Sequence, residues 1–186
     1  MASLAYYYFD FKDSQKQDRR GLLSSLLLQL SARSDVFGEL LTQMHLTHDE
    51  GSRQPSENDL IYNLKEMLTV YGQGKIYIVL DALDECSNKS GMPTSREKVL
   101  NLLEDLISLR LPHVHICVTS RPERDIQTAL EPLASHHVSL HEEGGQRQDI
   151  IDYLKSVVES DPRMGKWREE DKQLVIDTLA RKADGM

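Results

Sequence analysis

Residues 76–86 read Ile-Tyr-Ile-Val-Leu-Asp-Ala-Leu-Asp-Glu-Cys and are the most informative segment of the chain. Its first five residues are apolar or aromatic, and such a run, rich in β-branched side chains, favours a strand covered on both faces of a parallel sheet. Asp81 follows directly, and a carboxylate at the end of such a strand lies at the carboxyl edge of the sheet, where open α/β proteins bind their ligands. The stretch therefore predicts a buried strand and a ligand site together.

Two interpretations fit the acidic residues that close this stretch. Asp81, Asp84 and Glu85 lie within five positions, so their charges repel one another unless a cation or a phosphate site uses them. The plainer alternative is a buried strand that runs into an acidic, solvated loop. The mutual repulsion of the three carboxylates favours the ligand-binding interpretation, with the solvated loop as its alternative.

Composition narrows the class of protein. A chain of 186 residues is long enough for one domain with a sizeable core, and 39% hydrophobic with 28% charged residues argues against disorder. The formal charge of −8 and the absence of a basic patch argue against binding to nucleic acid or to an anionic membrane. No segment has the ~20 apolar residues of a spanning helix. Two cysteines give no disulfide framework, so we expect a reducing, cytoplasmic location.

Hydrophobic periodicity predicts strands that alternate with helices. Four strands are predicted, the last of them the weakest, at 4–11, 76–81, 114–119 and 137–140. Helices are predicted at 21–31, 36–45, 56–71, 94–110, 123–130, 147–159 and 169–182, two of them with capping residues, Ser56 with Asp59 and Thr94 with Glu97. This alternation predicts a parallel sheet covered by helices on both sides.

The residues around Asp81 suit the chemistry of a nucleoside triphosphate. Mg²⁺ prefers oxygen ligands and usually keeps several waters, so one strand-end carboxylate such as Asp81 is a suitable partner. Phosphoryl transfer also needs a group that orients the attacking water, and Asp84 or Glu85 could supply it. The sequence leaves open which of the two acts.

Arg121 is the candidate cation for this site. It lies just beyond the end of a neighbouring predicted strand, where it could complete the electrostatics around a γ-phosphate. The alternative is that Arg121 only pairs with Glu123 or Asp125 on the surface.

These segments together resemble the NACHT class of STAND NTPases. Residues 76–86 are similar to the family's Walker B segment, in which the metal-binding aspartate precedes a small residue and, two positions on, an acidic pair. Residues 118–122, Val-Thr-Ser-Arg-Pro, resemble the end of its sensor-1 strand. Residues 7–11 with 22–30 resemble the strand and helix that follow the phosphate-binding helix in the fungal, nephrocystin-type branch, and 149–154 and 182–186 resemble late segments.

The resemblance implies a fold and a set of roles. The fold would be α/β, a three-layer P-loop NTPase-like (ASCE/STAND) parallel sheet flanked by helices. Asp81 would bind the metal, Asp84 and Glu85 would be the catalytic pair, and Thr119 and Arg121 would contact the nucleotide. The implied cofactors are Mg²⁺ and ATP or GTP.

One departure from the family alters the functional expectation. The phosphate-binding sequence Gly-x-x-x-x-Gly-Lys-Ser/Thr does not occur in the 186 residues, and it would belong before Leu4 with its strand. In the family the strand order resembles 5-1-4-3-2, so the missing first strand would lie between the strands at 114–119 and 137–140. Because the loop amides and lysine supply most of the binding energy, we expect a fragment or truncated product that binds nucleotide poorly.

Two functional hypotheses follow. The first is a single partial NACHT domain over 1–186, with an α/β core at about 1–142 and the start of a helical part at about 146–186, acting as a nucleotide-dependent signalling switch. Whether these residues hydrolyse nucleotide stays open. The second is a non-catalytic interaction or scaffold module derived from such a domain. The resemblance implies other protein domains and self-oligomers as partners, with no nucleic acid and no membrane.

Overall fold

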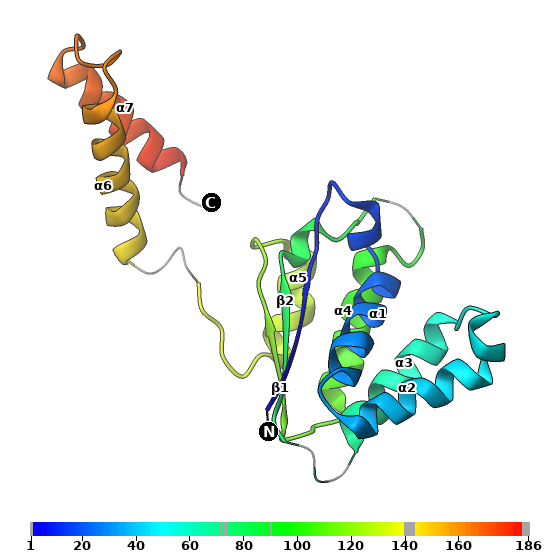
Figure 1. Ribbon diagram of the computed structural model, residues 1–186. Coiled ribbons are helices and arrows are strands. Elements are labelled where there is room, and N and C mark those ends of the chain that lie inside the picture. Colours follow the sequence, from blue (N-terminus) through cyan, green and yellow to red (C-terminus); the bar gives the residue numbers. More distant parts are fainter. Residues whose placement is uncertain (1, 71, 73, 90, 140–143, 184–186) are drawn as a thin grey trace. The chain divides into compact units, whose positions relative to one another are not determined.

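The computed structural model describes residues 2–70, 72, 74–89, 91–139 and 144–183 and divides the chain into two compact units, Met1–Ala134 and Ser135–Met186 (Figure 1). The assignment of both to one partial domain stays a prediction. The first unit contains β1 (Ser3–Tyr8), α1 (Arg19–Ser31), α2 (Asp35–Thr47), α3 (Glu57–Thr69), β2 (Ile76–Asp81), α4 (Ser95–Ser108), β3 (Val114–Val118) and α5 (Arg124–Leu130). The second contains α6 (Gly144–Ser160) and α7 (Glu169–Lys182).

The three strands form one parallel sheet in the order β1-β2-β3. The register pairs Tyr8 with Asp81 and Leu80 with Val118, so all three strands end at the same edge. The predicted α/β class and the parallel sheet are confirmed. The fourth predicted strand is not formed, since residues 137–139 have no strand structure and Leu140 lies outside the described residues.

Helices cover one face of the sheet. On that face the register aligns Ala5, Ile78 and Ile116 in one row across the three strands. Figure 1 shows α1 and α4 side by side along the sheet, with the α2–α3 hairpin beyond them. The core forms here because five leucines of α1 recur at helical spacing and are all buried: Leu22, Leu23, Leu26, Leu27 and Leu30.

The opposite face of the sheet is less covered within the first unit. Leu4, Tyr6 and Tyr8 alternate with the buried residues of β1 and are 49%, 47% and 54% exposed, and Tyr77 of β2 is 39% exposed. Alternation along a strand directs successive side chains to opposite faces, so these residues share one side. The expectation that residues 76–80 are covered on both faces therefore does not hold at Tyr77.

The outer edge of β1 is occupied by a side chain. Gln29 of α1 accepts a hydrogen bond from the Tyr6 N–H at Oε1 (3.0 Å) and donates one from Nε2 to the Tyr6 carbonyl (2.7 Å). Ser25, one helical turn earlier, accepts a second bond from Nε2 (2.9 Å) and orients the amide. The N–H and the carbonyl of Tyr6 therefore both have partners, although none of the described strands lies on that side of β1.

The helix ends follow the capping signals in the sequence. Both predicted capping boxes are present, with Ser56 and Asp59 at the start of α3 and Thr94 and Glu97 at the start of α4. Helix α7 has the predicted bounds. The predicted end of α3 at Tyr71 and the late segment 184–186 lie outside the described residues.

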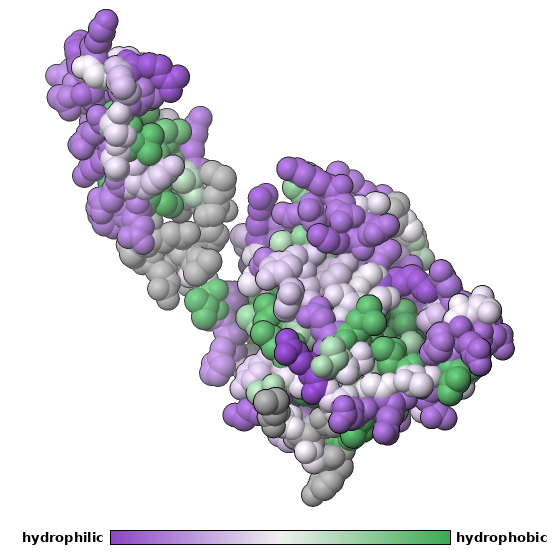
Figure 2. All heavy atoms as spheres, viewed as in Figure 1, coloured by the Kyte–Doolittle hydropathy of each residue, from purple (hydrophilic) through white to green (hydrophobic). Residues whose placement is uncertain are grey.

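The second unit is a helical hairpin. Val158 of α6 and Ile176 and Ala180 of α7 are buried, and Figure 2 shows hydrophobic residues where the two helices meet. Among the described helices of both units, none combines the length and the apolar character needed to cross a bilayer.

A close approach of backbone segments fixes the start of α1. A Cβ on Gly21 would lie 2.5 Å from the Gln15 carbonyl oxygen and 2.7 Å from the Tyr7 hydroxyl, which itself donates to the Gln15 carbonyl (3.2 Å). We expect Gly21→Ala to lower the free energy of unfolding by roughly 1–3 kcal/mol in denaturant titrations, because the backbone must shift.

The matched control is Gly38→Ala in α2. A Cβ there has the Ser31 carbonyl oxygen at 3.7 Å, an ordinary contact. Alanine is the better helix former, so this variant should be about 0.5–1 kcal/mol more stable than the original protein. A shift in the same direction for both variants would contradict this account of Gly21.

The cap of α3 gives the first unit an acid-sensitive contact. Asp59 accepts from Ser56 through the hydroxyl (2.7 Å) and the backbone N–H (2.8 Å), and it lies 3.2 Å from His48 Nε2. These contacts, the Ser56 hydroxyl first, lower the pKa of Asp59 from 3.8 to about 2. A lowered pKa stabilises the folded state above the ordinary value, and this stabilisation is lost as the pH falls towards the folded value.

We therefore expect Asp59→Asn to unfold more easily than the original protein at pH 7. The difference in unfolding free energy should shrink as the pH falls from about 4 to about 2. Glu66→Gln, an exposed position on the same helix, is the control and should show no such pH-dependent difference. An Asp59→Asn difference that stayed constant down to pH 2 would refute the assignment.

Candidate functional site

The site lies where β2 and β3 end. Asp81 closes β2, and its Oδ1 accepts a hydrogen bond from the hydroxyl of Thr119, the residue after β3. The same hydroxyl accepts from the Ala82 N–H at 3.1 Å. Thr119 therefore joins the two strand ends, and two of the predicted site residues are in direct contact.

The chain turns sharply after Asp81. Ala82 has φ 54° and ψ 47°, in the left-handed region, which costs an L residue roughly 1–2 kcal/mol. The following N–H, of Leu83, donates to the Thr119 carbonyl at 3.0 Å, and the Leu83 side chain is fully buried. This turn directs the one-turn helix η3 (Leu83–Glu85), which carries the acidic pair, along the edge of the sheet.

Asp84 and Arg121 form the second contact between the strand ends. Asp84 Oδ1 accepts from the Arg121 backbone N–H at 3.0 Å, and Oδ2 lies 3.5 Å from Arg121 Nε. The Asp84 side chain is only 11% exposed, whereas that of Arg121 is 73% exposed. Arg121 thus pairs with Asp84 and not, as the alternative had it, with Glu123 or Asp125. Its guanidinium remains accessible to a ligand.

Glu85 faces the other neighbouring strand. Its Oε2 accepts a hydrogen bond from the Phe11 N–H (3.1 Å), in the loop after β1. The two members of the acidic pair therefore diverge, Asp84 towards β3 and Glu85 towards the segment after β1. These contacts do not single out Asp84 or Glu85 as the group that orients water, so that role stays a prediction for both.

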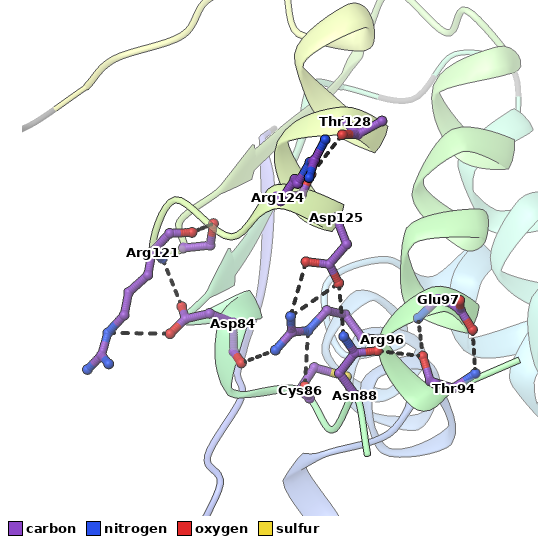
Figure 3. Close-up of polar contacts among 11 residues, drawn as sticks. Asp84, Cys86, Asn88, Thr94, Arg96, Glu97, Arg121, Arg124, Asp125 and Thr128 are labelled. Atoms are coloured by element: carbon purple, nitrogen blue, oxygen red, sulfur yellow. Dashed lines mark hydrogen bonds and ion pairs between the residues drawn. The ribbon is translucent and has the colours of Figure 1, made fainter. Parts of the chain in front are cut away.

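Sequence reasoning missed one residue of this region, Arg96 of α4. Its side chain donates to the carbonyls of Asp84 (2.5 Å) and Cys86 (3.2 Å) and to both carboxylate oxygens of Asp125 (Figure 3). The sequence held one usable signal, since Arg96 precedes the buried Val99 and Leu100 by three and four positions and so shares their face of α4.

The Cys86 thiol, which lies near the site, is not set up to react. Cys86 is buried and donates its S–H to the Gln17 carbonyl (3.2 Å). Burial is the largest cause that raises the pKa of the Cys86 thiol to about 11, and the charge of Arg96 opposes this only in part. The thiol is therefore protonated at neutral pH and is a poor nucleophile.

The oxygen donors at this edge would suit Mg²⁺ better than a cation that needs several protein ligands. Within the part of the chain that the structure describes, no three His, Cys, Asp or Glu side chains are grouped so that they could hold a metal ion. A single carboxylate such as Asp81 suits Mg²⁺ that takes its other ligands from phosphate and water, and it does not suit a cation that needs an all-protein cage.

Comparison with known proteins gives one match. A family model described as nephrocystin 3, N-terminal, matches residues 1–121, which is well over half of the chain. The matched segment begins before β1 and ends at Arg121, so it contains all the predicted site residues. Searches of the curated proteins and of the solved structures gave no match.

The strained turn at Ala82 is open to a direct test. Ala82→Gly removes the left-handed strain at some cost in chain entropy, so the variant should be as stable as the original or up to about 1 kcal/mol more stable. Ala129→Gly in α5 is the matched control and should be destabilised by about 1 kcal/mol. Thermal or denaturant unfolding compares them, and equal losses at both positions would contradict strain at Ala82.

Proposed function

Because the chain belongs to the nephrocystin 3 N-terminal family, we propose that its first unit is part of a P-loop NTPase core of the NACHT type. In this proposal the edge at Asp81 binds Mg²⁺ and a nucleoside triphosphate, ATP or GTP, and the bound state of the site controls a signalling switch. The single observation that carries the proposal is the hydrogen-bonded junction of Asp81 with Thr119, beside the Asp84–Arg121 pair.

The strand order supports the proposal. In the order 5-1-4-3-2 of the NACHT-type sheet, three consecutive positions are strands 4, 3 and 2, all parallel. The observed order β1-β2-β3 has this arrangement when β1 is strand 2, β2 is strand 3 and β3 is strand 4. In the complete three-layer fold the first strand would pair with β3, and helices would cover the face that carries Leu4, Tyr6 and Tyr8.

Each site residue has a role that its contacts suit. Asp81 would bind Mg²⁺, with the Thr119 hydroxyl holding the carboxylate in place. Arg121 would move its exposed guanidinium onto the γ-phosphate, since a phosphate is a stronger partner than a carboxylate at 3.5 Å. Asp84 or Glu85 would then orient the attacking water.

The phosphate-binding part of the site needs a contribution from elsewhere. The 186 residues contain no Gly-x-x-x-x-Gly-Lys-Ser/Thr sequence, whose backbone amides and lysine supply most of the hold on a triphosphate. We therefore expect these residues to bind nucleotide weakly by themselves. Other protein domains and further copies of the chain are the partners that such a switch would engage.

A second candidate function rests on the exposed sheet face. Leu4, Tyr6 and Tyr8 are each about half exposed within the first unit, an unusual position for three consecutive outward residues of a strand. A non-catalytic interaction or scaffold module would use such a face without any nucleotide. This candidate predicts that the residues at the Asp81 edge have no effect on ligand binding.

Calorimetric titration with ATP or GTP, with and without Mg²⁺, separates the two candidates. For the 186 residues we expect dissociation constants of about 1 mM or weaker. A chimera with a NACHT-type strand, phosphate loop and helix joined ahead of Leu4 should bind much more tightly, and only with Mg²⁺. Asp81→Asn in this chimera should abolish the Mg²⁺ dependence, whereas Asp105→Asn, on the exposed surface of α4, should not.

Two results would count against the switch. A folded chimera that binds no nucleotide would favour the interaction module. If the chimera and its Asp81→Asn variant bound nucleotide with the same affinity and the same dependence on Mg²⁺, Asp81 would not be the metal ligand. Saturable, Mg²⁺-dependent binding by the 186 residues alone would instead exclude the interaction module and overturn the expected dependence on a phosphate loop.

A further inference from the structure

Arg96 is the one arginine that the described part of the structure buries, with 6% of the residue exposed. A buried guanidinium is costly unless its donors are satisfied. Nη1 donates to both oxygens of Asp125 (3.3 and 3.2 Å), Nε to the Cys86 carbonyl (3.2 Å) and Nη2 to the Asp84 carbonyl (2.5 Å). All three nitrogens therefore have partners, and these belong to two different segments of the chain.

The contacts form a closed circuit beside the strand ends (Figure 3). Arg96 donates to the Asp84 carbonyl, and the Asp84 carboxylate accepts from the Arg121 N–H. Asp125, four residues after Arg121, pairs with Arg96 and completes the circuit. Asn88 extends the circuit, since its Nδ2 donates to Asp125 Oδ2 at 3.3 Å and its Oδ1 accepts from the N-cap hydroxyl of α4. Three segments, η3, the start of α4 and the start of α5, thus meet at one guanidinium.

We propose that Arg96 is a positioning residue that fixes Asp84 and Arg121 relative to each other, through the Asp84 carbonyl on one side and Asp125 on the other. The inference rests on the proposed nucleotide function for its biological meaning. Its physical content is independent of any nucleotide. Arg121 is free to exchange Asp84 for a phosphate, because Asp84 keeps its place through the backbone bond to Arg96 when the guanidinium of Arg121 leaves.

The shape of arginine matters for this role. The planar guanidinium reaches two backbone carbonyls and a carboxylate at once, whereas the ammonium of lysine is a point charge at the end of a flexible stem. Arg96→Lys keeps the charge beside Asp125 and loses the bridge to the carbonyls. A residue needed only for charge balance would tolerate this change, and a positioning residue would not.

Amide hydrogen exchange, followed by NMR on the full chain without nucleotide, tests the proposal. The reporter is the Arg121 N–H, which donates to Asp84. In Arg96→Lys and in Asp125→Asn we expect the Arg121 amide to exchange about tenfold faster or more, because a charged hydrogen bond is lost or loosened. Amides of β2 such as Ile78 should change far less.

Two further variants complete the design. Asp105→Asn removes a carboxylate from the same helix as Arg96, where it pairs with Lys65 at 3.0 Å, and should leave the Arg121 amide unchanged. If the single variants fail to fold, Arg96→Met combined with Asp125→Asn leaves no buried charge behind and should still release the Arg121 amide.

The proposal is overturned if the Arg121 amide keeps its original exchange rate in folded variants, or if all amides accelerate equally, as a purely structural role would give. A selective loss at Arg121 supports it whether or not nucleotide binds. The chimera with the phosphate loop then tests the function separately, because Arg96→Lys should weaken its nucleotide binding several-fold only if that function is correct.

Discussion

Parallel pairing in one register is the constraint on which the candidate site depends. Because β2 pairs with β1 and β3 without a shift between their ends, Tyr8, Asp81 and Thr119 reach the same edge of the sheet. A Thr119 displaced by one residue would point to the other face and could not hold Asp81. The acidic helix η3 and the Arg121 segment are continuations of these two strands, so the register of the sheet also decides which side chains meet beyond it.

Much of this arrangement could be predicted from sequence because the signals are local. Leucines at helical spacing predict α1, capping pairs such as Thr94 with Glu97 fix the helix starts, and the run that ends at Asp81 marks the central strand. The carboxyl edge then follows from the polarity of parallel strands. The contacts of Asp81 and of Arg121 fall at the predicted edge, although their roles towards a ligand stay predictions.

The rest depends on tertiary contacts that no local pattern encodes. Arg96 stands in the charged first turn of α4, and its spacing from Val99 and Leu100 indicates its face of the helix but not the partners elsewhere in the chain that satisfy its guanidinium. The left-handed conformation of Ala82 arises because Thr119 holds both sides of the turn. Residues 137–139 have no strand structure, since a strand exists only where a neighbour completes its hydrogen bonds.

The side chain of Gln29 makes the two edges of the sheet unequal as sites for a further strand. A carboxamide offers the same donor and acceptor as a peptide group, so at Tyr6 it takes the place of the hydrogen bonds that a neighbouring strand would supply. On β3 the peptide groups of Ile116 and Val118 point outward by alternation and have no partner among the described residues. A strand added beside β1 would thus have to displace Gln29 at Tyr6, whereas a strand added beside β3 would meet unpaired peptide groups.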